Sequence, residues 1–166
     1  MKVVIQRVKH ASVTVVNEDA STTLASEIGK GILCLVGIHE GDEQAHAEWI
    51  CKQILSAKIF EGMSEENADK RWRSSVKQNG FEVLLVSQFT LNGRVSSKGK
   101  IDFTGSMPPS KAKEFYEQFV EMVGTAHAPE LVKDGVFGAK MDVSLVNDGP
   151  ITLVVDSKDM KETTAP

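Results

Sequence analysis

The stretch Ser87 to Leu91, "SQFTL", holds the side chains whose types and spacing are best suited to chemistry. It closes the apolar run "VLLV" and opens a basic loop, so it is expected at the end of a strand. There, Ser87, Gln88 and Thr90 could offer polar groups to a ligand, while main-chain N–H groups of the turn could stabilise a developing oxyanion. The alternative is that the hydroxyls only satisfy main-chain groups at the strand end, and by spacing alone this is the more common role.

A second unusual stretch, Val146 to Val155, reads "VNDGPITLVV" and places a proline between two strand-like runs. Proline donates no hydrogen bond to a ladder, so Pro150 should interrupt strand pairing where it falls. Asn-Asp-Gly suits a hairpin turn, but Pro150, the residue after Gly149, cannot form the strand-pairing hydrogen bond that a hairpin needs at this position. The ordinary structural interpretation is then a bulge at a sheet edge or the start of a strand. Because the trans preference of a Gly-Pro bond is only about 0.5–1 kcal/mol, both isomers are accessible. The main chain at this point is therefore a candidate for function.

The usual catalytic motifs are absent from the sequence. It has no Gly-x-Ser-x-Gly elbow, no HExxH, no Walker loop and no dinucleotide glycine fingerprint. The four histidines are scattered, and none stands beside a serine or cysteine that it could activate, so a nucleophilic Ser87 or Thr90 has no visible base. Cys34 and Cys51 lack metal-ligand spacing and are interpreted as core thiols. We expect no metal and no cofactor.

Hydrophobic periodicity predicts the helices and strands around these residues. The run 81–91 is the best candidate for a central strand. One helix is expected from a cap at Asp42 to near Ala57, and a second from Pro108-Pro109, where apolar side chains recur at three- and four-residue steps. Further strands are expected at 3–7, 11–16, 22–28, 32–38 and 150–156. The first two of these strands are expected to be separated near Lys9-His10. The predicted fold class is α+β, with mostly antiparallel strand pairing and two main helices.

Composition limits the class of protein. At 166 residues and 41% apolar, the chain suits a single domain covering residues 1–166. The first residues lack the apolar stretch of a signal peptide, and no run is long enough to span a bilayer, so we expect a cytoplasmic location and no membrane. A net charge of -4 argues against binding nucleic acid by bulk electrostatics. The stretch Lys70 to Lys100, with seven basic residues against Glu82 alone, could still engage a phosphate backbone locally, although a solvated charged face is the commoner cause.

With both motifs considered together, the sequence resembles the D-aminoacyl-tRNA deacylases, also called the D-Tyr-tRNA deacylase (DTD) family. Their two signatures are a Ser-Gln-x-Thr-like motif and an Asn-x-Gly-Pro-Val-Thr-like motif, matched here by "SQFT" and "NDGPIT". The resemblance runs nearly end to end, through Gln6 to Val8, Ala11 to Val15, Gly29 to Gly37, Pro108-Pro109 and Phe137 to Met141. The chain departs from the family after Lys98-Gly99, where the family commonly carries a basic residue and a proline before Ser-Phe or Asp-Phe. Here Lys100 is followed by Ile101, Asp102 and Phe103, so the loop lacks that proline.

The resemblance implies a DTD-like fold and an obligate homodimer in which each subunit lends its Gly149-Pro150 turn, in the cis form, to the pocket of its partner. The carbonyl groups of that turn would leave no room for the side chain of an L-amino acid, whereas a D-residue or glycine could enter. Arg7 matches an arginine expected to brace the turn, and its ordinary alternative is an exposed ion pair. Phe137 and Met141 match positions expected near a terminal adenine, and core packing is the ordinary alternative for them.

The implied activity is hydrolysis of the ester that joins a D-amino acid, or mistakenly attached glycine, to the 3'-terminal adenosine of tRNA. The resemblance implies that no side chain acts as nucleophile. A main-chain N–H near Phe89 would hold the carbonyl oxygen, and the ribose hydroxyl next to the ester would help a water to attack. Two alternatives remain open at this point. One is an esterase acting through Ser87 or Thr90, and the other is a non-catalytic RNA-binding module that uses the Lys70 to Lys100 stretch.

Overall fold

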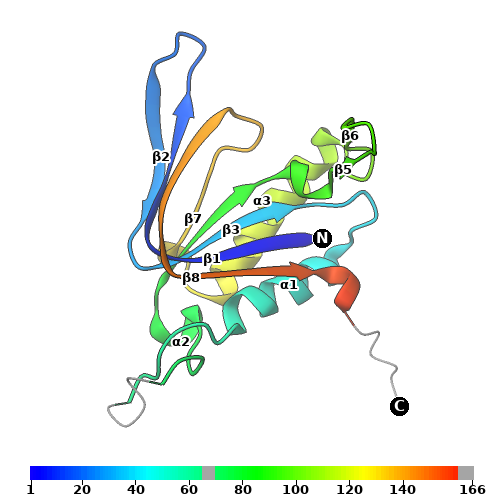
Figure 1. The fold of residues 1–166 in the computed structure, drawn as a ribbon. Helices are drawn as coiled ribbons and strands as arrows, with labels where there is room; N and C mark the ends of the chain where they lie inside the picture. Colours follow the sequence, from blue (N-terminus) through cyan, green and yellow to red (C-terminus); the bar gives the residue numbers. More distant parts are fainter. Residues whose placement is uncertain (65–69, 161–166) are drawn as a thin grey trace, which may run out of the picture.

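The computed structural model describes residues 1–64 and 70–160, and it confirms the α+β class (Figure 1). Within these residues the main sheet has six strands in the order β2-β1-β3-β4-β7, with β8 paired to β1. The strands are β1 (Lys2–Val16), β2 (Thr22–Ile28), β3 (Gly31–Gly37), β4 (Glu82–Ser87), β7 (Val132–Asp134) and β8 (Met141–Asp156). A separate small hairpin pairs β5 (Arg94–Val95) with β6 (Ile101–Asp102).

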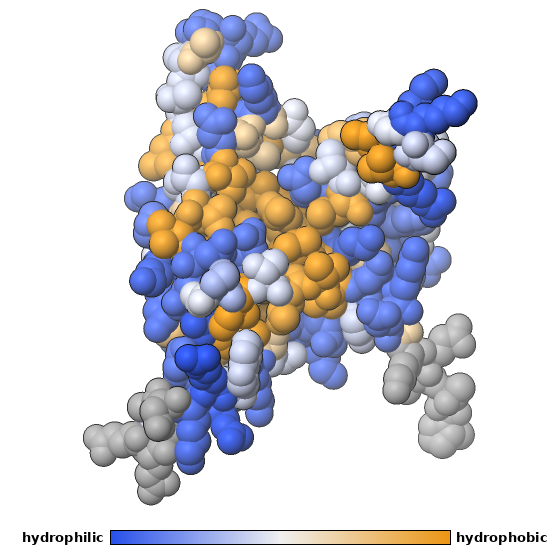
Figure 2. All heavy atoms as spheres, in the orientation of Figure 1, coloured by the Kyte–Doolittle hydropathy of each residue, from blue (hydrophilic) through white to orange (hydrophobic). Residues whose placement is uncertain are grey.

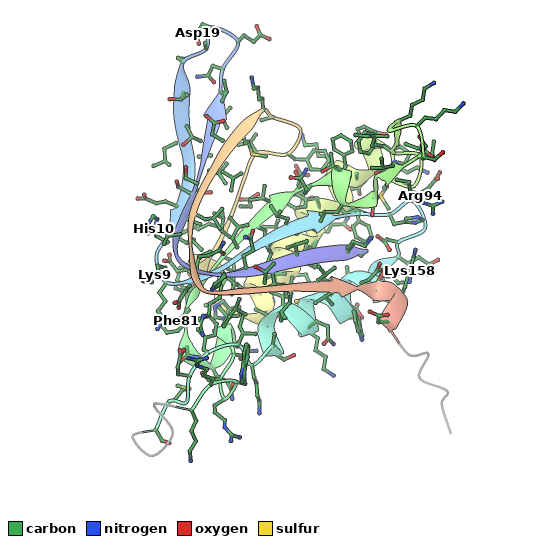
Figure 3. The ribbon with its side chains drawn as sticks, viewed as in Figure 1. Lys9, His10, Asp19, Phe81, Arg94 and Lys158 are labelled. Carbon is green, nitrogen blue, oxygen red and sulfur yellow. The ribbon has the colours of Figure 1, made fainter. Side chains whose placement is uncertain are left out.

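The prediction of two N-terminal strands was wrong, because β1 runs without a break. Its first half pairs with β3 and its second half with β2, while β8 follows it on both sides of the exposed pair Lys9 and His10. The β1–β8 register shifts between Gln6 and Val8 and again between Val8 and His10. Such irregularities bend a strand and increase its twist without ending it. The bend lies where Figure 3 labels Lys9 and His10.

Two long helices cover one face of the sheet: α1 (Gln44–Ser56) and α3 (Pro109–Ala126). Their apolar sides pack on alternate side chains of the strands, and Ile50, Phe119 and Cys34 are among the fully buried residues of this core. Helix α3 begins at Pro109, as the Pro-Pro pair predicts, because proline fits the first turn of a helix. Helix α1 is capped by Glu43 and not by Asp42. A four-residue helix, α2 (Val76–Asn79), lies before β4.

The opposite face of the sheet carries a second, smaller cluster of buried apolar side chains, which includes Val8, Leu33 and Leu84. Partly buried residues such as Leu35 and Leu145 pack around it. In the view of Figure 2, apolar atoms are visible across the face to which β1, β3 and β8 contribute. Across residues 1–64 and 70–160, no helix has the length and apolar character that crossing a membrane requires.

Candidate active site

The "SQFTL" motif lies where β4 ends and the chain enters a 3-10 turn over Phe89–Asn92. The main chain of this turn is held at both of its ends. The Gln88 N–H donates to the Val36 carbonyl on β3 at 2.7 Å, and the Gly93 N–H donates to the Thr90 carbonyl at 2.9 Å. The parallel pairing of β3 with β4 therefore fixes where the turn begins, and its own hydrogen bonds fix its shape.

The first N–H groups of the Phe89–Asn92 turn are available to a ligand. Among the described residues, neither Phe89 nor Thr90 donates its main-chain N–H to any acceptor. This follows from helical geometry, since the first N–H groups of a helical segment have no carbonyl behind them. Two adjacent, fixed N–H groups can hold a negatively charged oxygen, as an oxyanion hole does.

An apolar cavity of about 690 Å³ opens beside the turn. Ser87, Gln88 and Phe89 line it from the motif, and Phe137 and Met141 line it from the start of β8 and the loop before it. Another part of the wall comes from the segment that leads into α3 and from its first turn, with residues Phe103, Ser106, Met107, Pro108, Pro109 and Ala112. A cavity of this size and character is typical of a small-molecule or cofactor site. The fold thus brings together five of the nine predicted site residues.

Thr90 adjoins this group but does not line the cavity. Its side chain is exposed, and its hydroxyl accepts a hydrogen bond from the Gln88 amide. In the described part of the chain, no carboxylate or imidazole hydrogen-bonds to the hydroxyl of Ser87 or Thr90. No three or more His, Cys, Asp or Glu side chains in residues 1–64 and 70–160 are grouped as a metal site. The polar groups that face the cavity are therefore main-chain and neutral side-chain groups.

Tyr116 of α3 lies in the core next to the cavity wall. Its side chain is 1% exposed, and its ring is tilted against that of Phe137 with the centroids 5.7 Å apart. Burial, and then the nearby Asp134 carboxylate, raises the pKa of Tyr116, so the hydroxyl stays neutral.

Gly149 and Pro150 lie in a bulge of β8. Val8 pairs with Asn147 and Gln6 pairs with Thr152, so only one residue of β1 faces residues 148–151. The predicted interruption of pairing at Pro150 is therefore confirmed, and the Gly149-Pro150 bond is cis. Both residues are exposed, and neither lines the apolar cavity of its own chain.

Arg7 is the β1 residue that faces this bulge, and it is only 7% exposed. Its Nε donates to the main-chain oxygen of Asp148 at 3.3 Å and lies 3.2 Å from the carboxylate of the same residue. Its Nη1 donates to the Ile59 carbonyl at 2.7 Å and to the Glu61 carboxylate at 3.1 Å. The pKa of Glu61 is lowered, mainly because its carboxylate hydrogen-bonds to the Glu61 main-chain N–H and to a smaller extent because of Arg7. Through these contacts, Arg7 links Asp148, the residue before Gly149, to Ile59 and Glu61.

A family model described as D-Tyr-tRNA(Tyr) deacylase matches residues 4–156. The chain belongs to this family. A relative from Dictyostelium discoideum named D-aminoacyl-tRNA deacylase is 43% identical over 159 residues, which cover 96% of this chain and 99% of the relative. The Homo sapiens D-aminoacyl-tRNA deacylase 1 is 43% identical over 157 residues, which cover 95% of this chain and 70% of the relative. The name given to these relatives denotes a hydrolase that acts on the ester bond of aminoacyl-tRNA.

Two solved structures resemble this member of the D-Tyr-tRNA(Tyr) deacylase family. One is the c-Myc DNA Unwinding Element Binding Protein, which is 43% identical, with a TM-score of 0.83 over 94% of this chain and 98% of that one. The other is a probable eukaryotic D-amino acid tRNA deacylase, with a TM-score of 0.75 over 93% and 97% of the two chains. At 17% identity, this second likeness concerns the fold alone.

In this member of the deacylase family, Phe103 and Ser106 are cavity residues that sequence reasoning missed. The Phe103 ring meets the Phe89 ring edge-on with the centroids 5.1 Å apart, and the Ser106 hydroxyl donates to the Phe89 carbonyl at 3.1 Å. Both residues come after Ile101, where the family's proline is missing, and nothing in their spacing indicates a site. In the sequence, Pro108 and Pro109 indicate only the start of a helix.

Proposed function

We propose that this chain is a D-aminoacyl-tRNA deacylase that hydrolyses the ester between a D-amino acid, or mischarged glycine, and the 3'-terminal adenosine of tRNA. One observation carries the proposal: the unpaired N–H groups of Phe89 and Thr90 stand at the edge of an apolar cavity, in a chain of the deacylase family. We place this proofreading in the cytoplasm, and it requires no cofactor.

The N–H groups of the turn would hold the ester carbonyl oxygen as it becomes negatively charged. One such donor typically supplies about 2.7–4 kcal/mol of transition-state stabilisation. The oxygen of a water adds to the carbonyl carbon, and the bond from that carbon to the ribose oxygen breaks. The neighbouring ribose hydroxyl relays the proton from the water to the departing ribose oxygen. The products are a free amino acid and tRNA with an intact 3' end.

The terminal adenine would lie against Phe137 and Met141. Both side chains are partly buried and line the same cavity as Ser87 and Gln88. Stacking of a base on an aromatic side chain contributes about 1–3 kcal/mol, and it does so for any base. This contact, together with the oxyanion hole, would position the ester without a nucleophilic side chain, because positioning alone can remove a large part of a reaction barrier.

Selection for D-amino acids would depend on a second copy of the chain. Gly149 and Pro150 are exposed and do not line their own cavity, so a homodimer could place them in the cavity of the partner. Exposed apolar residues of β8 support such an interface: Val146 is 42%, Leu153 36% and Val154 67% exposed. The carbonyl groups of the turn would then face the α-carbon of the substrate and exclude an L side chain by steric clash. The contacts of Arg7 with Asp148 would hold the turn in place.

The test is release of amino acid from D-aminoacyl-tRNA and from its L counterpart. We expect the wild-type protein to hydrolyse the D-substrate and to spare the L-substrate, and we expect Thr90→Ala to retain activity. Loss of all activity in Ser87→Ala or Thr90→Ala, in a protein that remains folded, would favour the nucleophile alternative. Binding of tRNA without release of D-amino acid would favour the RNA-binding alternative. A monomer in sedimentation equilibrium would contradict the exchange of turns.

A further inference from the structure

A second, polar cavity of about 280 Å³ lies on the other side of the Phe89–Asn92 turn. The turn separates the two cavities, because Ser87 to Phe89 line the apolar one and Leu91 to Arg94 line the polar one. Lys158, which follows β8, also lines the polar cavity. Figure 3 labels Arg94 and Lys158 at the same end of the molecule.

The two carboxylates that line the polar cavity are already engaged by donors. Asp42 accepts the His39 N–H at 2.6 Å and pairs with the Met1 ammonium group. Asp156 accepts the main-chain N–H of Lys158 at 3.1 Å and lies 3.7 Å from the Lys2 ammonium group. The two carboxylates are therefore paired with the Met1 and Lys2 ammonium groups and not with Arg94 or Lys158.

Those two cations are Arg94 and Lys158. Both are exposed, and neither forms an ion pair with a carboxylate among the residues that the structure describes. Asp102 stands opposite Arg94 across the β5–β6 hairpin and attracts it electrostatically, but forms no ion pair with it; its carboxylate accepts the N–H of Thr104 at 2.9 Å and the hydroxyl of Thr104 at 3.0 Å. The polar cavity thus presents two cationic side chains to an anionic ligand.

Two aromatic side chains of the apolar cavity, Phe89 and Phe103, lie on and beside the turn that separates it from the polar cavity. Phe89 is 58% exposed, and the Phe103 ring supports it edge-on at 5.1 Å between centroids. An exposed aromatic side chain next to cationic side chains is the composition with which proteins bind single-stranded nucleic acid, since bases stack on the rings and phosphates meet the cations. A four-residue 3-10 turn is only about 8 Å long, so the phosphodiester attached to a single adenosine can reach its other side.

We propose that the polar cavity is a subsite for the phosphodiester group that precedes the terminal adenosine, and that the RNA strand reaches it across the Phe89–Phe103 pair. This inference rests on the proposed function, in which the apolar cavity holds the terminal adenosine. Arg94 supplies a planar fork that suits phosphate oxygens, and Lys158 supplies a second cation as a point charge.

Binding of adenosine and of the dinucleotide cytidylyl-(3'→5')-adenosine, which carries one phosphodiester, tests the subsite without catalysis. In the wild-type protein the dinucleotide should bind about tenfold more tightly, because it gains a charge-assisted hydrogen-bonded contact. Arg94→Gln and Lys158→Gln should each remove most of this gain and weaken its salt dependence. Lys52→Gln, which removes an exposed cation on α1, is the matched control and should keep the gain. Equal binding of the two ligands to the wild-type protein would overturn the proposal.

Kinetics separate this inference from the function on which it rests. For Arg94→Gln, the ratio of kcat/KM on D-aminoacyl-tRNA to kcat/KM on the 3'-D-aminoacyl ester of adenosine should fall about tenfold. An equal fall on both substrates, or an unchanged ratio, would overturn the subsite and leave the deacylase activity standing. If the wild-type protein hydrolysed neither substrate, the proposed function and the subsite would fall together.

Discussion

Replacing Gly37 with alanine tests whether the position of the Phe89–Asn92 turn determines the reaction rate. Gly37 ends β3 directly beneath this turn. A β-carbon at Gly37 would lie 2.9 Å from the β-carbon of Leu91 and 3.2 Å from the Gln88 carbonyl oxygen. Ordinary contact begins at 3.4 Å, so Leu91 would have to move by about 0.5 Å. Neither contacted atom is the far end of a flexible side chain, so the turn itself must shift.

The shift should reduce the rate more than it reduces substrate binding. Hydrogen bonds to an oxyanion need donor distances of about 2.7–3.1 Å, and a misplacement of about 1 Å can cost about 100-fold. A shift of about half that size should therefore lower kcat about tenfold, with KM changed little. Overpacking should also lower the free energy of unfolding by about 1–3 kcal/mol.

The assay is steady-state hydrolysis of D-aminoacyl-tRNA, combined with urea unfolding of the same preparation. Gly124→Ala on α3 is the matched control, because its β-carbon would meet Pro129 at an ordinary 3.6 Å and alanine favours a helix. The control should keep kcat and should not lose stability. The reasoning would be refuted if Gly37→Ala lost the expected stability but kept kcat within about twofold of the wild-type value.

Three further predictions concern the bulge in β8 and its support. Arg7→Lys should lower the urea-derived free energy of unfolding by about 1–3 kcal/mol and weaken the discrimination between D- and L-aminoacyl-tRNA. One ammonium group cannot donate to both the Ile59 and the Asp148 carbonyl, as Arg7 does. Unchanged values of both quantities would count against a role of Arg7 in holding the turn. Glu61→Gln should be slightly less stable than wild type at pH 7, and the difference should disappear on acidification. The reason is that the folded-state pKa of Glu61 is lowered from the usual glutamate value of 4.5. Such a carboxylate stabilises the fold at pH values above 4.5 and loses that contribution as the pH falls through the lowered pKa. Urea unfolding at pH 7 and at pH 3 would show this, and an equal difference at both values would contradict it. Gly149→Ala should raise the hydrolysis of L-aminoacyl-tRNA relative to the D-substrate, because the turn must change shape. The angle φ is 120° at Gly149, and an added β-carbon would lie 2.9 Å from the Ile151 side chain. An unchanged ratio of D- to L-hydrolysis would argue against a role of the turn in selection.

Local rules predicted the elements well where one local signal dominates. The start of α3 at Pro109 follows from the preference of proline for a first helical turn, and the strand that ends at Ser87 follows from a continuous apolar run. The break expected near Lys9 and His10 was wrong because polarity suggested a turn. Pairing with β8 on both sides of that point carries the strand through a bend, and this pairing joins segments more than 120 residues apart.

The amino-acid sequence identifies the chemically unusual residues, which are the "SQFTL" motif and the Gly149-Pro150 dipeptide, and the family resemblance connects the two. How these residues are grouped in space depends on the fold. The β3–β4 pairing and the approach of α3 bring Phe137 to the same cavity as Ser87, whereas the β1–β8 register places Gly149 and Pro150 away from that cavity, beside Arg7. The physical reason is that turn and helix signals act between near neighbours in the chain. Strand register and the packing of α3 are set by apolar contacts between distant segments, which no local pattern specifies.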